Sequence, residues 1–471
     1  MTTAACCDKM NTYYRLGHGG MKDIVVPEYI EKIMRVLRRA GIRAYLVGGC
    51  VRDAAMGRTP YDYDITAAAV PSALERALSR AGYSLDLCGA RFGTVAAVTG
   101  GLRVEVTSMR RESGYSDMRR PDLIEYTDSL EEDLARRDFT VNAMAYSLEE
   151  GLCDPFGGMT DISAGLIRCV GDPYLRFEED ALRILRALRF SAVLGFGIEK
   201  QTAAACREKC ENLYAVSGER VFSELIRTLC GSSVESVLRK FSKVICCAVP
   251  EIRPCVGFDQ CNPHHDRTVY DHIIRSVACI PPVEHLRLTM FFHDIGKPGT
   301  CTRDENGICH FRGHEQAGAG IAEKTMSRMG VNRALKEKVE KLILFHDIRP
   351  ESDRRALLRY YSRLGIENAE DILLVRRADV MAQSREYMHD SLTELEKLER
   401  LTQAIIKENA CMKISNLAIG GKEVIEAAGI CPGPQVGQIL ERLLSKVIDG
   451  DIDNERAALY AEAAALAKEE L

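Results

Sequence analysis

The sequence predicts an α+β N-terminal domain, with a small mixed sheet and covering helices, followed by a mostly α-helical remainder. Its 471 residues exceed what one compact core holds, so two to four domains are expected. Segments typical of strands lie before about residue 165, whereas helical spacing dominates after about residue 172. With 46% hydrophobic and 28% charged residues, the chain has the composition of a folded protein.

Local patterns define the first elements. A helix is expected over residues 27–41, where apolar side chains recur at helical spacing and a glycine ends the pattern. Ala44–Val47 reads as a short apolar strand, and Gly48-Gly49 forms the turn into a helix over Cys50–Met56. These residues therefore form a βα unit with a glycine-rich connection.

Further strands follow in the same domain. The alternating segment Tyr61–Thr66 puts Asp62 and Asp64 on one face, because side chains repeat every two residues along a strand. Val95–Val98 and Leu102–Thr107 flank two glycines and are expected to form a tight hairpin. The chain up to about residue 165 is thus a mixed α/β domain.

The later part of the chain is helical and divides by composition. Eight of the ten histidines lie between His264 and His346, which sets off a module at about 260–385. The remainder is helical and charge-rich, with a loop expected at Gly429–Gly437.

Net charge and cysteine use limit the function classes. The formal charge of −5 excludes a globally basic nucleic-acid binder but permits local basic patches. We find no leader segment and no apolar run of about 18 residues, so a cytoplasmic protein without membrane contact is expected. The eighteen cysteines include no CxxC pair, and reduced thiols are expected. Cys206/Cys210 and Cys255/Cys261 are interpreted as buried small hydrophobes rather than metal ligands.

The glycine turn and the two aspartates together outline a site for a nucleoside triphosphate. Gly48-Gly49 lets the backbone approach phosphate oxygens, and the following helix directs free N–H groups at the same anion. Arg52 adds a charge-assisted hydrogen bond. Asp62 and Asp64 repel each other unless a divalent cation lies between them, and Mg²⁺ takes such ligands while also binding phosphates. A glycine turn beside a solvent-facing acidic strand is the competing interpretation.

A second pair of residues is a candidate reader of the base. Asp180 and Arg183 are three apart in a helical segment, so they occupy neighbouring positions on one face. Cytosine and adenine both present an amino donor beside a ring-nitrogen acceptor, which a carboxylate and a guanidinium match. An ordinary surface ion pair is the alternative. Arg186 and Arg189 continue the same face and offer phosphate contacts.

Several segments, in order, resemble class II tRNA nucleotidyltransferases and bacterial poly(A) polymerases, over about half the chain. They are LVGGCVRDAAMG (Leu46–Gly57), DYDIT (Asp62–Thr66), RVEVTSMRRESGY (Arg103–Tyr115), RRDFTVNAMAY (Arg136–Tyr146), DPFGG (Asp154–Gly158), EEDALRILRALRF (Glu178–Phe190) and SGERVFSEL (Ser217–Leu225). The resemblance implies that an RNA 3′-hydroxyl attacks the α-phosphorus of CTP or ATP, with two Mg²⁺ ions held by Asp62 and Asp64. Glu105 is a candidate third carboxylate near the metals, or a structural surface glutamate.

The resemblance also implies the nucleotide-binding residues. Those expected to organise the triphosphate and ribose are Arg136, Arg137, Asp138 and Asn142, and those expected to select CTP and ATP are Glu179, Asp180 and Arg183. The polar segment Arg111–Asp122 reads as a mobile loop, which similar enzymes use when they switch from C to A addition. The expected partners are therefore the tRNA 3′ end, CTP and ATP.

The histidine-rich module follows the order H…HD…H…H…D of the HD superfamily. Neutral imidazoles and carboxylates are ligands for Mn²⁺, Fe²⁺, Co²⁺, Ni²⁺ or Zn²⁺. The resemblance implies a first metal site and ligands for a second; the first set is His272, His293, Asp294 and Asp379, and the second is His314 and His346. Such modules hydrolyse phosphate esters. A fold kept only for packing is the alternative.

These observations together predict a CCA-adding tRNA nucleotidyltransferase. The expected domains are an N-terminal tail (1–25), a nucleotidyltransferase head (26–167), a helical neck and body with the base-reading helix (168–260), an HD domain (261–385) and a helical tRNA-binding tail (386–471). A bacterial poly(A) polymerase or an enzyme that adds only A is the nearest alternative, and an HD phosphodiesterase or phosphatase is the alternative from another class. The sequence predicts no oligomeric state.

Overall fold

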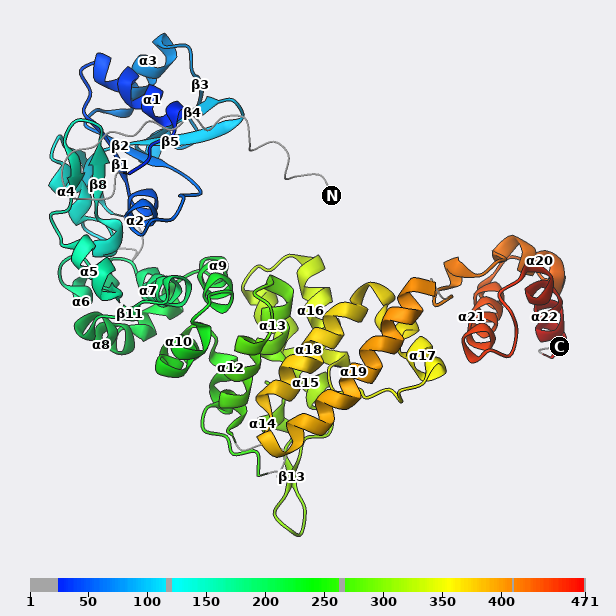
Figure 1. Ribbon diagram of the computed structural model, residues 1–471. Helices are drawn as coiled ribbons and strands as arrows, with labels where there is room; N and C mark the ends of the chain where they lie inside the picture. Colours follow the sequence, from blue (N-terminus) through cyan, green and yellow to red (C-terminus); the bar gives the residue numbers. More distant parts are fainter. Residues whose placement is uncertain (1–23, 116–120, 262–266, 409–410, 470–471) are drawn as a thin grey trace. The chain divides into compact units, whose positions relative to one another are not determined.

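The structure is a computed structural model that divides into two compact units, Met1–Ser233 and Val234–Leu471 (Figure 1). The residues it describes are 24–115, 121–261, 267–408 and 411–469. The expected α+β head followed by largely helical regions is confirmed. The division between the units falls inside the expected neck and body (168–260). No helix among the described residues has the length and apolar character that a membrane crossing needs.

A seven-stranded sheet lies at the centre of the first unit, in the order β3-β4-β5-β2-β1-β8-β9. β2 and β5 are parallel, and the other neighbours are antiparallel. The strands are β1 Ala44–Val47, β2 Asp64–Ala67, β3 Ser84–Asp86, β4 Thr94–Thr99, β5 Leu102–Ser108, β8 Ala145–Ser147 and β9 Gly151–Cys153. Shorter pairs are β6 Arg110–Ser113 with β7 Leu123–Tyr126 and β10 Leu166–Ile167 with β11 Gly197–Ile198.

Helices pack against this sheet and continue beyond it. The helices of the first unit are α1 Glu28–Arg39, α2 Gly49–Ala55, α3 Pro71–Arg80, α4 Leu130–Ala135, α5 Gly158–Ala164, α6 Pro173–Glu179, α7 Leu182–Leu194, α8 Lys200–Glu208 and α9 Gly218–Leu229. Helices α6 to α9 pack on one another rather than on this sheet. Ile33 of α1 and Leu74 of α3 are fully buried in one apolar cluster with Ile65 of β2. Leu134 of α4 packs in a separate cluster with Val47 of β1. The apolar spacing that predicts the helix over residues 27–41 therefore marks the side of α1 that packs on the sheet.

The first unit differs from the sequence prediction in two loops. β2 begins only at Asp64, so Asp62 lies in the bend before it rather than within the strand. The expected mobile loop Arg111–Asp122 begins with strand residues, because β6 pairs with β7; residues 116–120 lie outside the described ranges. The hairpin of β4 and β5 is confirmed, and its turn glycines Gly100 and Gly101 have positive φ angles of 56° and 80°.

The second unit is helical, with one two-stranded hairpin. Its elements are α10 Val234–Lys240, α11 Ser242–Ala248, α12 Val269–Cys279, α13 Glu284–Phe292, α14 Lys297–Thr300, β12 Thr302–Arg303, β13 Cys309–His310, α15 His314–Arg328, α16 Arg333–Phe345, α17 Arg354–Leu364, α18 Ala369–Ala382, α19 Arg385–Glu408, α20 Gly421–Ala428, α21 Pro434–Asp449 and α22 Arg456–Glu469. Strands β11, β12 and β13 contradict the prediction that strands end by residue 172, since two residues are too few to show a period. The loop expected at Gly429–Gly437 is shorter, because Pro434 begins α21.

Candidate nucleotide site and candidate metal centre

The glycine turn after β1 opens a cavity of about 510 Å³ in the first unit. Gly48 has a φ of 78°, and a Cβ built there would lie 3.3 Å from the Arg137 guanidinium. The backbone conformation therefore favours glycine at this position, and a side chain here would also crowd Arg137. The cavity is lined by Gly48, Gly49, Arg52, Asp62, Asp64, Arg137, Asp138, Asn142, Asp180, Leu182, Arg183, Arg186, Arg189, Phe190 and Arg220.

Asp62 and Asp64 both line this cavity, although only Asp64 belongs to β2. Desolvation by the surrounding protein, and then repulsion from Asp62 and Glu105, raise the pKa of Asp64 to about 6. The nearby Arg137 opposes this rise only in part. A divalent cation at this position would relieve the repulsion, so the carboxylates present fit the magnesium that the sequence predicts.

Glu105 lies beside Asp64 but not in the cavity wall. The two residues are paired in the parallel register of β2 and β5. The Glu105 carboxylate forms an ion pair with Arg103, which also contacts Asp86 at 3.2 Å. Its negative charge therefore acts on Asp64 from the neighbouring strand, while its side chain is already engaged by Arg103.

A buried aspartate orients the two arginines of the RRD segment. Asp133 of α4 is fully buried and accepts hydrogen bonds from Arg136 at 2.7 Å and Arg137 at 3.2 Å. Arg137 reaches the cavity, whereas Arg136 turns away from it toward Asp133 and Glu112. The structure thus brings Arg137 to the glycine turn, whereas Arg136 is held by two carboxylates outside the cavity lining, and its direct role at the triphosphate stays a prediction.

Asp138 and Asn142 connect the sheet to α7. Asp138 accepts a 2.8 Å hydrogen bond from Arg186 of α7 and a 3.1 Å hydrogen bond from Asn142. Burial alone would raise the pKa of Asp138, but the Arg186 charge and these hydrogen bonds hold it at about 2. Asn142 in turn accepts a 2.7 Å hydrogen bond from Arg52. The four predicted residues Arg52, Arg137, Asp138 and Asn142 therefore meet at one wall of the cavity.

The two candidate base-reading residues line the same cavity, but not on one continuous helix. α6 ends at Glu179, Asp180 has an extended backbone with φ of −144°, and α7 begins at Leu182. The prediction of a single helical face is therefore wrong. The Asp180 carboxylate accepts a 3.1 Å hydrogen bond from the Leu182 N–H at the start of α7, which fixes the break between the helices.

Neighbouring charges hold both of these side chains in place. Arg220 of α9 donates a 3.0 Å hydrogen bond to Asp180. Glu179 accepts a 2.6 Å hydrogen bond from Arg183, which also donates to the Arg176 carbonyl at 3.1 Å. Asp180 and Arg183 are thus each bound to a different partner and leave the i,i+3 ion pair unformed in this structure.

Sequence reasoning gave no role to two residues that support the site from α9. Arg220 holds Asp180, and Glu224 is buried and forms an ion pair with Arg189 at 2.6 Å. Both belong to the segment SGERVFSEL, in which these two charged residues are four positions apart on α9, and Glu224 is buried beside Val221 and Leu225. That spacing indicates a shared face, but the partners lie about forty residues away and only the fold identifies them.

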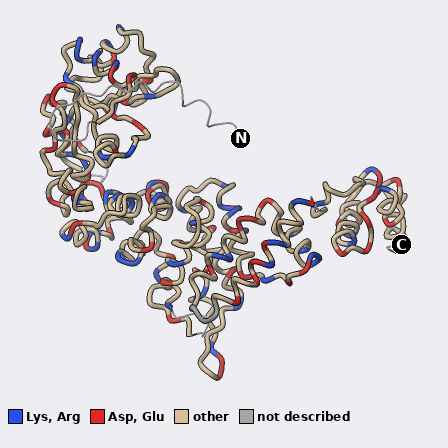
Figure 2. Tube along the Cα trace, viewed as in Figure 1, with Lys and Arg blue, Asp and Glu red and all other residues tan. Residues whose placement is uncertain are grey.

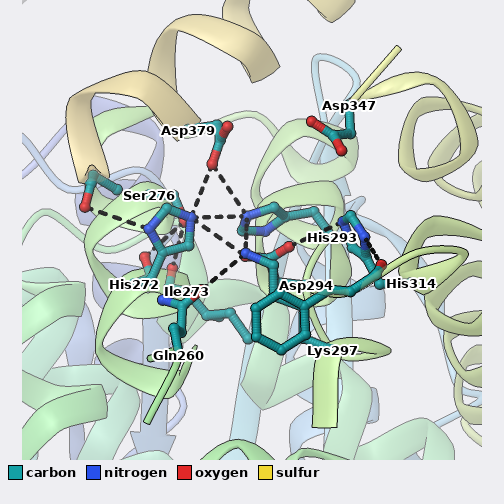
Figure 3. Close-up of polar contacts among 12 residues, drawn as sticks. Gln260, His272, Ile273, Ser276, His293, Asp294, Lys297, His314, Asp347 and Asp379 are labelled. Atoms are coloured by element: carbon teal, nitrogen blue, oxygen red, sulfur yellow. Dashed lines mark hydrogen bonds and ion pairs between the residues drawn. The ribbon is translucent and has the colours of Figure 1, made fainter. Parts of the chain in front are cut away.

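The predicted HD residues of the second unit converge on one buried carboxylate (Figure 3). Asp294 lies with its Oδ2 3.4 Å from His272 Nε2 and 3.3 Å from His293 Nε2. Its Oδ1 lies 3.4 Å from His314 Nε2 and 3.8 Å from His346 Nε2. Asp294 therefore joins two sets of three ligand atoms, as one bridging residue would.

Asp379 completes the first of these sets. Its Oδ1 is 2.8 Å from His272 Nε2 and 3.6 Å from His293 Nε2. The charges of His293 and Lys297 hold the pKa of Asp294 well below its usual range although burial opposes this, and hydrogen bonds from His272 and His293 do the same for Asp379. Both carboxylates are thus present as anions, which is the form that binds a cation.

Backbone carbonyls fix the tautomer of all four imidazoles. The Nδ1 atoms donate to Ala382 O at 3.3 Å, Met290 O at 2.8 Å, Phe311 O at 2.8 Å and Ile343 O at 2.6 Å for His272, His293, His314 and His346 in turn. A carbonyl can only accept, so Nδ1 of each ring carries a proton and Nε2 faces the centre. Facing Nε2 atoms lie only 3.3 Å apart in two places, close enough for one cation to bind both atoms of a pair.

The surroundings of this centre carry further charges. It opens into a cavity of about 560 Å³. Lys297 lies 2.7 Å from Asp294 Oδ2 and donates a 3.0 Å hydrogen bond to Gln260. Arg312 and Arg349 also line the cavity, together with the acidic residues Glu315, Asp347 and Asp390, so its charges are mixed. Donor set, burial and tautomers fit divalent transition metals.

Acidic and basic side chains are interspersed along both units, as Figure 2 shows. The first unit nevertheless gathers six arginines around its cavity, where the lining includes only four acidic residues. The sequence-level expectation of a local rather than global basic surface is consistent with this distribution.

Three protein-family models match parts of this chain. Residues 44–168 match a model described as the poly A polymerase head domain, and residues 195–243 match "Probable RNA and SrmB- binding site of polymerase A". Residues 321–463 match a model for domain 2 of tRNA nucleotidyltransferases. This model, rather than an HD-superfamily model, covers the region of His346 and Asp379, and it crosses the expected boundary at residue 385.

Relatives that match nearly the whole chain, and solved structures of similar fold, are described as CCA-adding enzymes. The CCA-adding enzyme of Pediococcus pentosaceus is 31% identical over 438 residues, covering 92% of this chain and 97% of that protein. That of Ligilactobacillus salivarius is 29% identical and covers 95% and 99%. The Bacillus stearothermophilus CCA-adding enzyme in complex with CTP has a TM-score of 0.69 at 26% identity, covering 93% and 97%. The Thermotoga maritima CCA-adding enzyme complexed with tRNA shares the fold, with a TM-score of 0.55 at 22% identity and coverage of 94% and 97%.

Asp138→Asn is expected to lower the free energy of unfolding by about 2 kcal/mol at pH 7. The folded-state pKa of about 2 lies below the usual value, so this stabilisation is complete above about pH 4 and is lost as the pH falls through about 2. Urea denaturation of the variant and the unchanged protein at pH 7 and pH 2.5 measures the difference. Asp128→Asn, whose side chain is 91% exposed, is the control, and an equal difference at both pH values would contradict the prediction.

His346→Ala is expected to reduce Mn²⁺ binding by the second unit from two ions to one per chain, because Asp294 and His314 alone complete no three-ligand set. The remaining site should keep an affinity within about tenfold of the original. Titration calorimetry of the metal-stripped full chain measures both quantities. His389→Ala, at an exposed position, should bind like the unchanged protein. If His346→Ala binds as many Mn²⁺ ions as the unchanged protein, the second set of ligands is excluded.

Proposed function

The chain belongs to the CCA-adding enzyme family of tRNA nucleotidyltransferases, and we propose that it adds C, C and A from CTP and ATP to the 3′ end of tRNA without a nucleic-acid template. One observation carries the proposal: a single cavity holds the two aspartates, the glycine turn and the residues expected to read the base. The relatives whose printed descriptions name CTP, ATP and tRNA support these three partners for this chain.

In this proposal Asp62 and Asp64 hold divalent cations beneath the triphosphate. When bound, such cations lower the pKa of the attacking 3′-hydroxyl and offset the charge on the departing pyrophosphate. Gly48 admits the phosphates to the backbone, and Arg137 contributes a guanidinium 3.3 Å from the position that a Cβ of Gly48 would occupy. Asp133 positions Arg137, and Glu105 adds negative charge from the neighbouring strand.

The same proposal assigns base selection to Asp180 and Arg183. Asp180 accepts from the exocyclic amino group shared by cytosine and adenine, and Arg183 donates to the adjacent ring nitrogen. Arg220 and Glu179 hold the two side chains apart, so that each keeps polar atoms for a base rather than for the other. Uracil and guanine present the reverse donor and acceptor pattern and leave these groups unpaired.

A poly(A) polymerase is the nearest alternative, because the head matches a model with that name. The match of nearly the whole chain to CCA-adding enzymes favours CCA addition, since the helical regions after the head are included in those alignments. Addition restricted to A is a narrower alternative that the product sequence distinguishes.

We propose metal-dependent hydrolysis of a phosphate ester as a second activity. Its support is the buried centre at Asp294, where fixed Nε2 atoms and anionic carboxylates are gathered. A metal bound there would activate a water molecule for attack on phosphorus. Lys297, Arg312 and Arg349 supply positive charge for the phosphate group.

Purified protein offered tRNA that lacks its last three nucleotides, with Mg²⁺, CTP and ATP, is expected to add C, C and A and then stop. Asp62→Ala should reduce the rate at least about a thousandfold, because the remaining carboxylate cannot hold the cations alone. Sequencing of the product and single-turnover rates give both results. Asp128→Ala should react at the original rate, whereas unlimited A tails would indicate the polymerase and no addition would exclude both enzymes.

Arg220→Ala is expected to reduce kcat/KM for CTP roughly tenfold and to raise misincorporation from UTP, because Asp180 loses its ion pair and with it a fixed acceptor position. Rates with each of the four nucleoside triphosphates measure the ratio. Arg227→Ala, an exposed arginine on the same helix, is the control. An equal loss of kcat/KM with all four nucleotides would show that Arg220 only stabilises α9 and does not affect base selection.

A further inference from the structure

Two thiols lie in contact at the base of the β12–β13 hairpin. Cys301 precedes β12 and Cys309 begins β13, and their Sγ atoms are 3.1 Å apart. Cys309 is fully buried, whereas Cys301 is half-buried. The described cysteines of the chain are thiols rather than disulfides. The sequence prediction of reduced thiols thus describes this structure, but it does not anticipate a pair.

The hairpin holds these two side chains together before any bond forms. Its strands pair Thr302 with His310 and Arg303 with Cys309. Asp304 closes the turn, since its carboxylate accepts from the Asn306 N–H at 2.9 Å and the Ile308 N–H at 3.0 Å. Little backbone movement is therefore needed to bring the sulfurs to bonding distance.

We propose that Cys301 and Cys309 form a reversible disulfide. With hydrogen peroxide as oxidant, the half-buried Cys301 thiol is oxidised to a sulfenic acid and releases one water molecule. The Cys309 sulfur then attacks the sulfenic sulfur, the S–O bond breaks, and a second water carries away the oxygen and the Cys309 proton. A dithiol reductant returns both residues to thiols by exchange.

The geometry favours a disulfide over a thiolate metal site. A tetrahedral zinc holds two sulfurs about 3.8 Å apart, at Zn–S distances of roughly 2.3 Å, whereas these sulfurs are closer. A third thiol, Cys261, lies nearby, because its carbonyl accepts from the Cys309 N–H at 3.1 Å. Arg303 donates to the Cys261 sulfur at 3.4 Å, so a cation already adjoins the thiols. Among the described residues, the three-ligand groups contain histidine and aspartate only.

One thiol of the pair, Cys309, lies in the wall of the cavity that opens on Asp294. Cys309 lines this cavity, and the chain continues from β13 directly to His314. A disulfide bond between Cys309 and Cys301 would restrain β13, and with it the wall residues between Cys309 and His314. This consequence rests on the proposed metal centre, whereas formation of the disulfide does not.

Peroxide treatment of the full chain, followed by trypsin without reductant, tests the proposal directly. Cleavage after Arg303 puts Cys301 and Cys309 in different peptides, which remain joined only through a disulfide. The joined pair is expected in wild type and in Cys279→Ser, to disappear with dithiothreitol, and to be absent from Cys301→Ser. Alkylation of Cys301 and Cys309 should fall at least about fivefold relative to the buried Cys206 and Cys210.

Three results would overturn the proposal. These are unchanged alkylation of both thiols, over-oxidation of Cys301 with Cys309 still a thiol, and stoichiometric zinc that is lost in Cys301→Ser. Hydrogen exchange over residues 301–314 should slow in oxidised wild type but not in Cys301→Ser, and equal exchange would exclude the anchoring role. Because these readouts need no metal at Asp294 and no hydrolysis, failure of the disulfide and failure of the proposed metal centre remain distinguishable.

Discussion

The ion pair between Asp138 and Arg186 is the interaction on which the candidate nucleotide site depends. It joins the segment after α4 to helix α7; the Asp138 side chain is buried, and that of Arg186 is 34% exposed. A buried carboxylate is stable only when opposite charge and hydrogen-bond donors surround it, and Arg186, Asn142 and the Phe139 N–H meet this need. Because the pair is fixed, the residues that begin α7 face the same cavity as the two aspartates of the sheet.

Other charged side chains that line this cavity are also paired with opposite charges. Asp133 holds Arg137, Arg220 holds Asp180, and Glu224 holds Arg189. Each of these cavity-lining groups thus has a partner in the layer behind it. Such pairing holds each side chain in a fixed position. A site that discriminates among bases by hydrogen bonding requires fixed donors and acceptors.

The side chains of the candidate metal centre in the second unit are held in a different way. Its carboxylates are held as anions by neighbouring cationic groups, and the Nδ1 atoms of its imidazoles are oriented by backbone carbonyls. Nε2 atoms and carboxylate oxygens therefore face one another in a small volume, an arrangement that favours cation binding. The adjacent thiol pair lies outside this set of ligands, and one of its members, Cys309, lines the same cavity.

The sequence by itself determined the head strands and helices with clear periodicity, the glycine turn and the order of the candidate ligands, because these depend on local spacing. It did not anticipate the contacts that local spacing does not encode. Asp180 interrupts a helix because its carboxylate binds the Leu182 N–H, and Arg136 turns from the cavity because Asp133 and Glu112 attract it. The contacts of Arg220, Glu224 and Cys309 join residues that are distant in the chain or brought together by a turn. Only tertiary packing decides these contacts, because the fold determines which charged groups and thiols are buried next to one another.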